Sequence, residues 1–392
     1  MRLCSKSASF FFSVSLAPPA KRPQGDLPYI DVGKNYPVKE VFLTDIADVS
    51  YLHLNSDDDD YLYRGGISCI TPNTIVVSDA SSGSILFFSR NGNAKSRFNR
   101  YGRGPEEYLG ASYVIYDEIA DDVFVTNFGS GSFSDFIQVY SSTGEHKRKI
   151  TLPGADIGSI VPFDEQSFLV YDSKFEWVRN TKNLGMNIFP TEYGHSPFFL
   201  ISKTDGTILD YIELPQNDIV LNIDNNSQQW FPPARVVKCI EGIHLCNPET
   251  DTIFLYNMDK SLTPIIHKTP LVSKLDPMVI LNNCLDVGRH QFMELVTLTK
   301  EGIRLPIHLM RDKNTGEVFR QKLLLPEYTG KGLVISPSQS RNRVYENGYY
   351  FELDLVELKE AYAQNKLSGK LKELVATLKA DDNNVFVIAE FK

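Results

Sequence analysis

The run Thr74-Ile-Val-Val-Ser-Asp79, a Ser/Gly turn, the run Ser84-Ile-Leu-Phe-Phe-Ser89 and the turn Arg90-Asn-Gly92 decide the fold. β-Branched and aromatic residues fill both runs, and Gly, Asn, Asp and Ser separate them. This is the pattern of antiparallel strands joined by hairpin turns. The same order of strands and turns recurs along the chain, with further copies over residues 122–152, 167–214 and 242–267 and a looser copy over 307–324.

Another apolar run precedes each of the four well-formed copies, at residues 66–70, 112–116, 159–163 and 235–240. Each unit therefore has four short strands. Sheets of this kind, repeated with a period of roughly 40 to 50 residues, are typical of β-propeller blades stacked around a ring.

The two ends of the chain supply material for a sixth blade. Residues 384–389 form a strand whose only neighbour in sequence is 349–353, and residues 40–43 and 49–54 are strands without partners near the other end. We therefore predict an all-β, six-bladed β-propeller with four-stranded antiparallel blades, the last of them closed by both termini. Leu, Ala, Glu and Lys at helical spacing predict one or two short helices within residues 355–378.

The composition agrees with one folded domain. The chain has 392 residues, 42% of them hydrophobic, with 24 Phe and 19 Tyr, which is enough for a large core. We expect a single propeller over residues 27–392, with a long insertion at about 173–196 and a helical one at about 355–378. The net charge of −9 and the lack of clustered Lys and Arg argue against nucleic-acid binding.

The first 26 residues look like a targeting leader or a disordered segment. A basic start precedes the apolar stretch 8–17, which is too short to span a membrane and is typical of a signal peptide. Cys4 offers an alternative, lipid attachment behind a truncated leader. We therefore expect an extracytoplasmic protein, periplasmic or at the cell surface, that touches a membrane only through such a lipid anchor.

The five cysteines contain no Cys-x-x-Cys pair. We interpret Cys239 and Cys246, which lie in apolar runs, as packed core thiols, with a disulfide between them as the alternative. The histidines show no zinc-binding spacing, and no Gly-x-Ser-x-Gly or phosphate-binding loop occurs.

One motif stands between the first two blades: Arg97-Phe-Asn-Arg-Tyr-Gly-Arg-Gly-Pro-Glu-Glu-Tyr108. It resembles the Gly-x-Gly-Pro-x-Glu-Tyr/Phe loop of bacterial six-bladed β-propellers related to NHL-repeat proteins, which are often secreted lipoproteins of gut anaerobes. The opening residues 27–31 and 39–46 are also similar to that family, so the resemblance spans residues 27–392. It implies the fold but no activity, because related propellers bind proteins or sugars or act as lyases.

The motif has a structural and a functional interpretation. Structurally, Gly102 and Gly104 would allow positive φ in a tight crossover, Glu106 or Glu107 would accept backbone N–H bonds, and Tyr108 would pack between blades. Functionally, the loop would present a ligand surface. The binding candidates in it are Arg100, Arg103, Glu106, Glu107 and Tyr108.

Asp79, Asn127, Asp172 and Asn247 occupy equivalent places at the end of the second strand of successive blades. Local Asx turns explain such residues. The alternative is a ring of oxygen ligands around a central Ca²⁺. No other cofactor is predicted.

The insertion 173–195 adds Trp177 and Arg179 to the binding candidates. Aromatic residues on long loops can stack on sugars or anchor a partner, and burial as a lid is the alternative. The crossover loop, the second-strand ends and this insertion should share one rim of the ring, because each strand reverses direction.

These features favour a monomeric binding or scaffolding module that presents one face to an unidentified protein or glycan. A Ca²⁺-assisted hydrolase or lyase that uses the channel, and a structural subunit of a surface assembly, are the alternatives.

Overall fold

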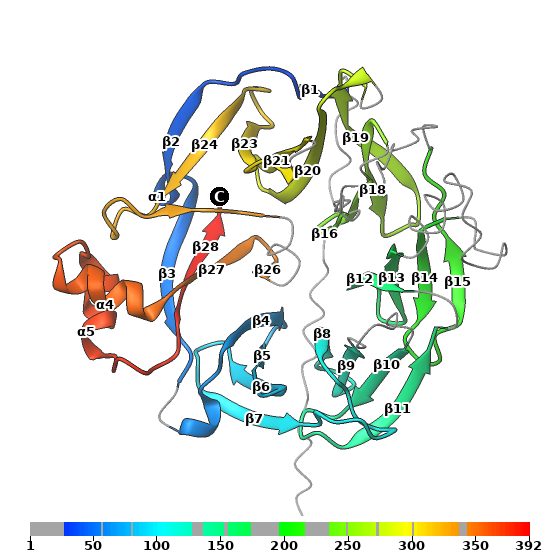
Figure 1. The fold of residues 1–392 in the computed structure, drawn as a ribbon, viewed down its shortest axis with the longest axis vertical. Coiled ribbons are helices and arrows are strands. Elements are labelled where there is room, and N and C mark those ends of the chain that lie inside the picture. The colour runs from blue at the N-terminus through cyan, green and yellow to red at the C-terminus, as the bar shows by residue number, and fades with distance from the viewer. Residues whose placement is uncertain are drawn as a thin grey trace, which may run out of the picture.

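The computed structural model describes residues 27–55, 58–79, 81–127, 136–152, 156–173, 196–215, 235–247, 250–271, 274–299, 302–336 and 343–392. Six antiparallel sheets surround a common centre, as predicted (Figure 1). In each sheet one edge strand lies nearest the centre and the other strands follow outwards. The protein is therefore a six-bladed β-propeller with a central channel.

Blades 1 to 3 are continuous in sequence and have four strands each. Blade 1 holds β4 (Gly65–Ile70), β5 (Thr74–Asp79), β6 (Ser84–Ser89) and β7 (Ala94–Asn99). Blade 2 holds β8 (Ala111–Asp117), β9 (Asp122–Asn127), β10 (Phe136–Tyr140) and β11 (His146–Thr151). Blade 3 holds β12 (Ile157–Pro162), β13 (Ser167–Asp172), β14 (Phe198–Ser202) and β15 (Ile208–Tyr211).

Blades 4 and 5 each gain an outer parallel strand from the N-terminal region. Blade 4 holds β16 (Arg235–Cys239), β17 (Gly242–Cys246), β18 (Thr252–Asn257) and β19 (Leu262–Thr269), and β1 (Tyr29–Asp31) pairs with β19. Blade 5 holds β20 (Met278–Val287), β21 (His290–Thr299), β23 (Ile307–Asp312) and β24 (Val318–Leu324), with β22 (Gly302–Ile303) and β25 (Gly332–Leu333) at its margins. Strand β2 (Val38–Phe42) pairs with β24. The expectation that residues 40–43 join the last blade is therefore wrong.

Blade 6 closes the ring with both ends of the chain. It holds β26 (Val344–Tyr345), β27 (Gly348–Leu353), β28 (Val385–Phe391) and, outermost, β3 (Ala47–His53). The β28–β3 register runs from Val385 opposite His53 to Phe391 opposite Ala47. The predicted closure by both termini is confirmed.

Apolar side chains fill all six joints between neighbouring blades. Successive residues of a strand point to opposite faces, so Ile75 and Val77 pack toward blade 6 while Val76 packs toward blade 2. Both faces of a blade are buried. This is why the strand runs are almost continuously apolar instead of alternating.

The helices lie outside the ring. The short α1 (Leu43–Ile46) links β2 to β3, and the 3₁₀ turn η1 (Asp59–Tyr61) precedes β4. The predicted helices are α4 (Leu355–Ala363) and α5 (Gly369–Thr377), which connect β27 to β28 and pack against the outer side of blade 6 (Figure 1). None of the helices within the described residues has the length and apolar character that crossing a membrane requires.

Candidate functional site

The crossover between blades 1 and 2 is a compact loop held by its own backbone. The N–H of Gly102 donates to the carbonyl of Tyr108 (3.0 Å), and the N–H of Tyr108 donates to the carbonyl of Arg100 (3.0 Å). A carboxylate oxygen of Glu107 accepts the N–H of Gly104 at 2.7 Å. The predicted capping carboxylate is therefore Glu107.

Positive φ is not the reason for the two glycines, contrary to expectation, since neither Gly102 nor Gly104 belongs to the residues with positive φ. The reason is the close approach of Glu107. An added Cβ would lie 2.0 Å from its carboxylate at Gly102 and 3.0 Å from it at Gly104. The glycines make room for the side chain that caps the loop.

Tyr108 is fully buried between blades 1 and 2, as the structural interpretation predicts. Its hydroxyl donates to the carbonyl of Gly83 at 2.7 Å, and its ring packs edge-on against Tyr140. Burial raises the pKa of Tyr108 to about 12, so the hydroxyl remains a donor at neutral pH. From blade 2, Tyr140 and Gln138 donate to the carbonyls of Glu106 and Pro105 at 2.8 and 2.9 Å.

The remaining binding candidates differ in their surroundings. The Arg100 side chain donates to the carbonyl of Gly144 at 2.8 Å, so it also ties the loop to blade 2. Arg103 is exposed, and the exposed Glu106 side chain lies 3.7 Å from His146. Trp177 and Arg179 lie outside the described residues.

The second-strand ends serve their own turns or neighbouring segments where the structure describes them. The Asp79 carboxylate accepts the N–H and hydroxyl of Ser81 (2.8 and 2.7 Å) and the hydroxyl of Ser82 (2.9 Å). Burial alone would raise the pKa of Asp79, but these bonds together hold that pKa below its ordinary value. Asp172 accepts the N–H of Asp156 at 2.9 Å, and Asn247 is buried.

The Asn127 side chain lies outside the described part of the chain. Within that part, no group of three or more His, Cys, Asp or Glu side chains has an arrangement that could hold a metal ion.

A cavity of about 790 Å³ opens at the mouth of the channel on the opposite rim. Strands alternate in direction, so the turns between first and second strands lie at the other end of the blades from the crossover loop. These turns line the cavity. The lining residues belong to blades 1, 2, 3, 4 and 6: Ser68–Asn73, Tyr113–Ile119, Phe124, Ile160–Pro162, Phe168, Lys203, Lys238–Ile240 and Val344–Glu346.

Two lysines from neighbouring blades reach into this cavity. Lys203 extends over the ring of Phe168, with its ammonium 5.3 Å from the ring centre and 3.5 Å from the Asp117 carboxylate. Lys238 is accessible from the channel although protein surrounds it. Desolvation, followed by the charge of Lys203, lowers the pKa of Lys238.

Aromatic and acidic groups complete the wall. Arg90 stacks on Tyr345, 4.3 Å from its ring centre. Glu118 accepts the hydroxyl of Thr74 (2.6 Å) and the N–H of Asn73 (3.1 Å) in blade 1. Burial works to raise the pKa of Glu118, but its hydrogen bonds lower it overall, so the carboxylate is charged at neutral pH. Ile119 and Ile240, at the turns, are 96% and 61% exposed.

This cavity is not among the sites predicted from the sequence. Its residues come from five blades, and no local motif joins them. One available signal was the pair of isoleucines placed in polar hairpin turns, where Gly, Asn or Asp is usual.

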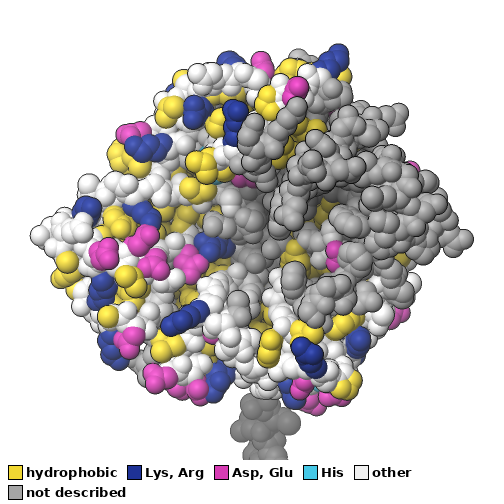
Figure 2. Space-filling view, viewed as in Figure 1, with side chains coloured by type: hydrophobic (Ala, Val, Ile, Leu, Met, Phe, Trp, Pro, Cys, Tyr) yellow, Lys and Arg dark blue, Asp and Glu magenta, His cyan; other side chains and the backbone are white. Residues whose placement is uncertain are grey.

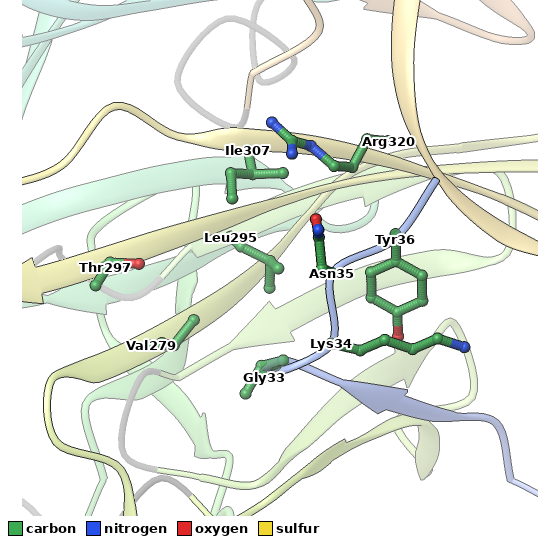
Figure 3. Close-up of a pocket in the computed structure, with 10 residues that line it drawn as sticks. Gly33, Lys34, Asn35, Tyr36, Val279, Leu295, Thr297, Ile307 and Arg320 are labelled. Carbon is green, nitrogen blue, oxygen red and sulfur yellow. The ribbon is translucent and has the colours of Figure 1, made fainter. Parts of the chain in front are cut away.

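A second, smaller cavity of about 210 Å³ lies where the N-terminal segment passes from blade 4 to blade 5. In Figure 3 the side chains of Asn35 and Arg320 lie near each other, above Leu295. The Tyr36 hydroxyl accepts the N–H of Asp31 at 3.1 Å, which fixes the segment between β1 and β2. This cavity is therefore a gap beneath the N-terminal segment that connects β1 to β2.

Among the described residues on the face drawn in Figure 2, Lys and Arg are interspersed with Asp and Glu, without a field of one sign. This mixture offers no electrostatic footprint for a polyanion on that face.

Residues 20–193 match the model of a family described as a 6-bladed beta-propeller. Among solved structures, a Bacteroides fragilis protein named as a candidate exported protein has a TM-score of 0.60 and 14% identity, covering 91% of this chain and 99% of its own. A Bacteroides vulgatus protein has a TM-score of 0.45 and 9% identity, with 88% and 97% covered. An inactive virginiamycin B lyase of Staphylococcus aureus has a TM-score of 0.40 and 10% identity, with 87% and 99% covered.

No curated protein matches the sequence. At these identities the likeness concerns the fold alone.

Proposed function

We propose that this six-bladed β-propeller is an extracytoplasmic binding protein that takes a polar, ring-bearing ligand, such as a glycan, in the cavity at its channel mouth. The observation that carries the proposal is the composition of that cavity. Tyrosine and phenylalanine rings stand beside lysine, carboxylate and amide groups in a space of about 790 Å³. Pockets of this size with a few convergent polar groups are typical of small-molecule sites.

Two observations support an extracytoplasmic location of the protein. The N-terminal residues 8–17 have the composition of a signal-peptide core, and a solved protein of the same fold is named as a candidate exported protein. The other rim is the alternative site, since Arg103 and Glu106 are exposed there.

The test is a glycan array followed by calorimetry on the wild type and three variants. Lys238→Ala and Ile240→Asn change exposed side chains of the cavity, and Arg103→Ala is the matched change on the other rim. We expect each cavity variant to weaken binding by about tenfold, that is about 1.4 kcal/mol, and Arg103→Ala to leave it unchanged. The reverse pattern would move the site to the crossover rim, and no binding of any polar ring-bearing ligand would refute the proposal.

A further inference from the structure

Cys239 and His244 form a pair in the wall of the channel cavity. They lie on β16 and β17, where Cys239 is opposite Gly242 and Val237 is opposite His244. Residues directly opposite each other share a face, so both side chains point toward blade 5. The Cys239 sulfur lies 3.5 Å from Nε2 of His244. Cys239 lines the cavity, whereas His244 is fully buried behind it.

Blade 5 supplies a carboxylate to the same imidazole. Asp286 on β20 lies 4.0 Å from Nε2 of His244, and its side chain is almost completely buried. Lys313 forms a short ion pair with one Asp286 oxygen, and Gln291 donates to the other at 3.3 Å. The carboxylate is therefore held in place beside the imidazole.

Asn283 contacts the other nitrogen of the imidazole, Nδ1. Its side-chain amide makes a short contact with Nδ1 of His244, while its oxygen is buried without a partner among the described residues. The amide oxygen and nitrogen are interchangeable in shape. The structure places the amide nitrogen against Nδ1; in the turned orientation the oxygen would instead accept a proton from Nδ1, and the lone pair of Nε2 would face the thiol.

We propose that Cys239 is a thiol nucleophile, with His244 as its general base, and that it exchanges with small disulfides that enter the channel cavity. The inference shares the cavity of the proposed function but does not need its ligand.

The step balances without another reactant. His244 takes the thiol proton, and the sulfur of Cys239 attacks one sulfur of the disulfide. A new S–S bond joins Cys239 to that half, the old S–S bond breaks, and the leaving thiolate takes the proton from His244. Among the described residues Cys239 forms no disulfide, so it starts reduced.

The surroundings favour transfer to the imidazole over loss of the proton to water. Burial and then the negative charge of Asp286 raise the pKa of Cys239 to about 12. The same carboxylate stabilises the imidazolium, because it lies 4.0 Å from Nε2, the nitrogen that also faces the sulfur. The charged groups around the pair are Asp286 and Lys313 of blade 5 and Lys238 and Glu241 of blade 4.

Cys69 is a matched comparison within the same molecule. It lines the same cavity, and burial raises its pKa to about 12 as well. The neighbours that act on that pKa are the Tyr116 backbone and Glu118, not an imidazole. A difference in reactivity between the two thiols therefore reports on His244.

The experiment uses the full chain carrying Cys4→Ser, which removes the thiol outside the described residues. The protein is treated with dithiobis(nitrobenzoic acid) or with the uncharged dithiodipyridine, and each modified cysteine is identified by peptide mass spectrometry over time. We expect Cys239 to react at least about tenfold faster than Cys69 with both reagents. Its rate should rise at a lower pH than the rate of Cys69, instead of only at the alkaline pH of an isolated thiol.

His244→Gln should reduce the rate of Cys239 to that of Cys69, because glutamine can bond Asn283 but cannot remove the thiol proton. If this variant fails to fold, the two thiols and the pH profile of the parent chain still decide. Equal rates for Cys239 and Cys69, or a profile that rises only in the alkaline range, would mean that the cluster merely aligns blades 4 and 5. Loss of glycan binding in Lys238→Ala is scored separately, so either proposal can fail alone.

Discussion

The Tyr108 hydroxyl ties the crossover loop to blade 1. That hydroxyl donates to the Gly83 carbonyl at 2.7 Å and lies 3.3 Å from the N–H of Arg100, which donates to it. Both partners are backbone groups that would lose their hydrogen bond without it. The crossover loop therefore has a structural role, whichever face of the propeller binds the ligand.

Tyr108→Phe removes this hydroxyl and leaves the ring in place. We expect the free energy of unfolding to fall by about 1–3 kcal/mol, because a buried carbonyl loses its partner. Urea denaturation followed by circular dichroism measures the change. Tyr101→Phe is the control, since Tyr101 is 58% exposed, and equal effects of the two substitutions would contradict the role of the hydroxyl.

At this scale the sequence predicts some roles and not others. It predicts a capping glutamate and a packed tyrosine in the motif, because both follow from the local pattern. It does not show that Gly102 accommodates the Glu107 carboxylate, since that contact depends on loop geometry. The Cys239–His244 pair had a usable signal, because a two-residue turn between strands places residues five apart on one face.

The strands of the N-terminal region act as a strap across three blades. β1, β2 and β3 are the outermost strands of blades 4, 5 and 6, in that order. In blades 4 and 5 they cover an edge that would otherwise expose unpaired backbone groups. Ile30 on β1 is fully buried in the joint between blades 4 and 5.

Ile30→Ala tests whether this strap belongs to the cooperative unit. We expect it to lower the free energy of unfolding by about 2–4 kcal/mol through lost packing and a cavity. Val38→Ala on β2, where the side chain is 62% exposed, should change stability by less than about 0.5 kcal/mol. If Ile30→Ala leaves the free energy of unfolding unchanged, β1 detaches before the ring unfolds.

Local pattern explains why the first four blades could be predicted and parts of the fifth could not. Blades 1 to 4 repeat short runs closed by turn residues. Strands β20 and β21 have ten residues each and long buried stretches, so the blade-length pattern does not mark them. The placement of β1 and β2 follows from pairing with residues more than two hundred positions away, which no local pattern contains.

The whole ring is held by six apolar joints and by the pairing of β28 with β3. Stability is therefore shared around the circle. This bears on the alternative of a central Ca²⁺, which would add a further, ionic contribution to the stability of the ring.

We predict that a chelator leaves the melting temperature within about 1 °C of its starting value, because Asp79 and Asp172 already accept protein hydrogen bonds. An ion at a hundred times its Kd would contribute about 2.7 kcal/mol, which melting would detect. Differential scanning calorimetry with and without chelator, and with Ca²⁺ restored, is the measurement. A drop that Ca²⁺ reverses would establish the ion ring instead.

The strap also sets the order in which the molecule can be completed during synthesis. Each strand of the strap can pair only after its partner has been synthesised: Tyr29 pairs with His267, Val38 with Arg320 and Ala47 with Phe391. Strands β1, β2 and β3 thus leave the ribosome well before the strands with which they pair, and blade 6 cannot close before β28 has emerged. Such distant pairings slow folding and leave strand edges open on the nascent chain.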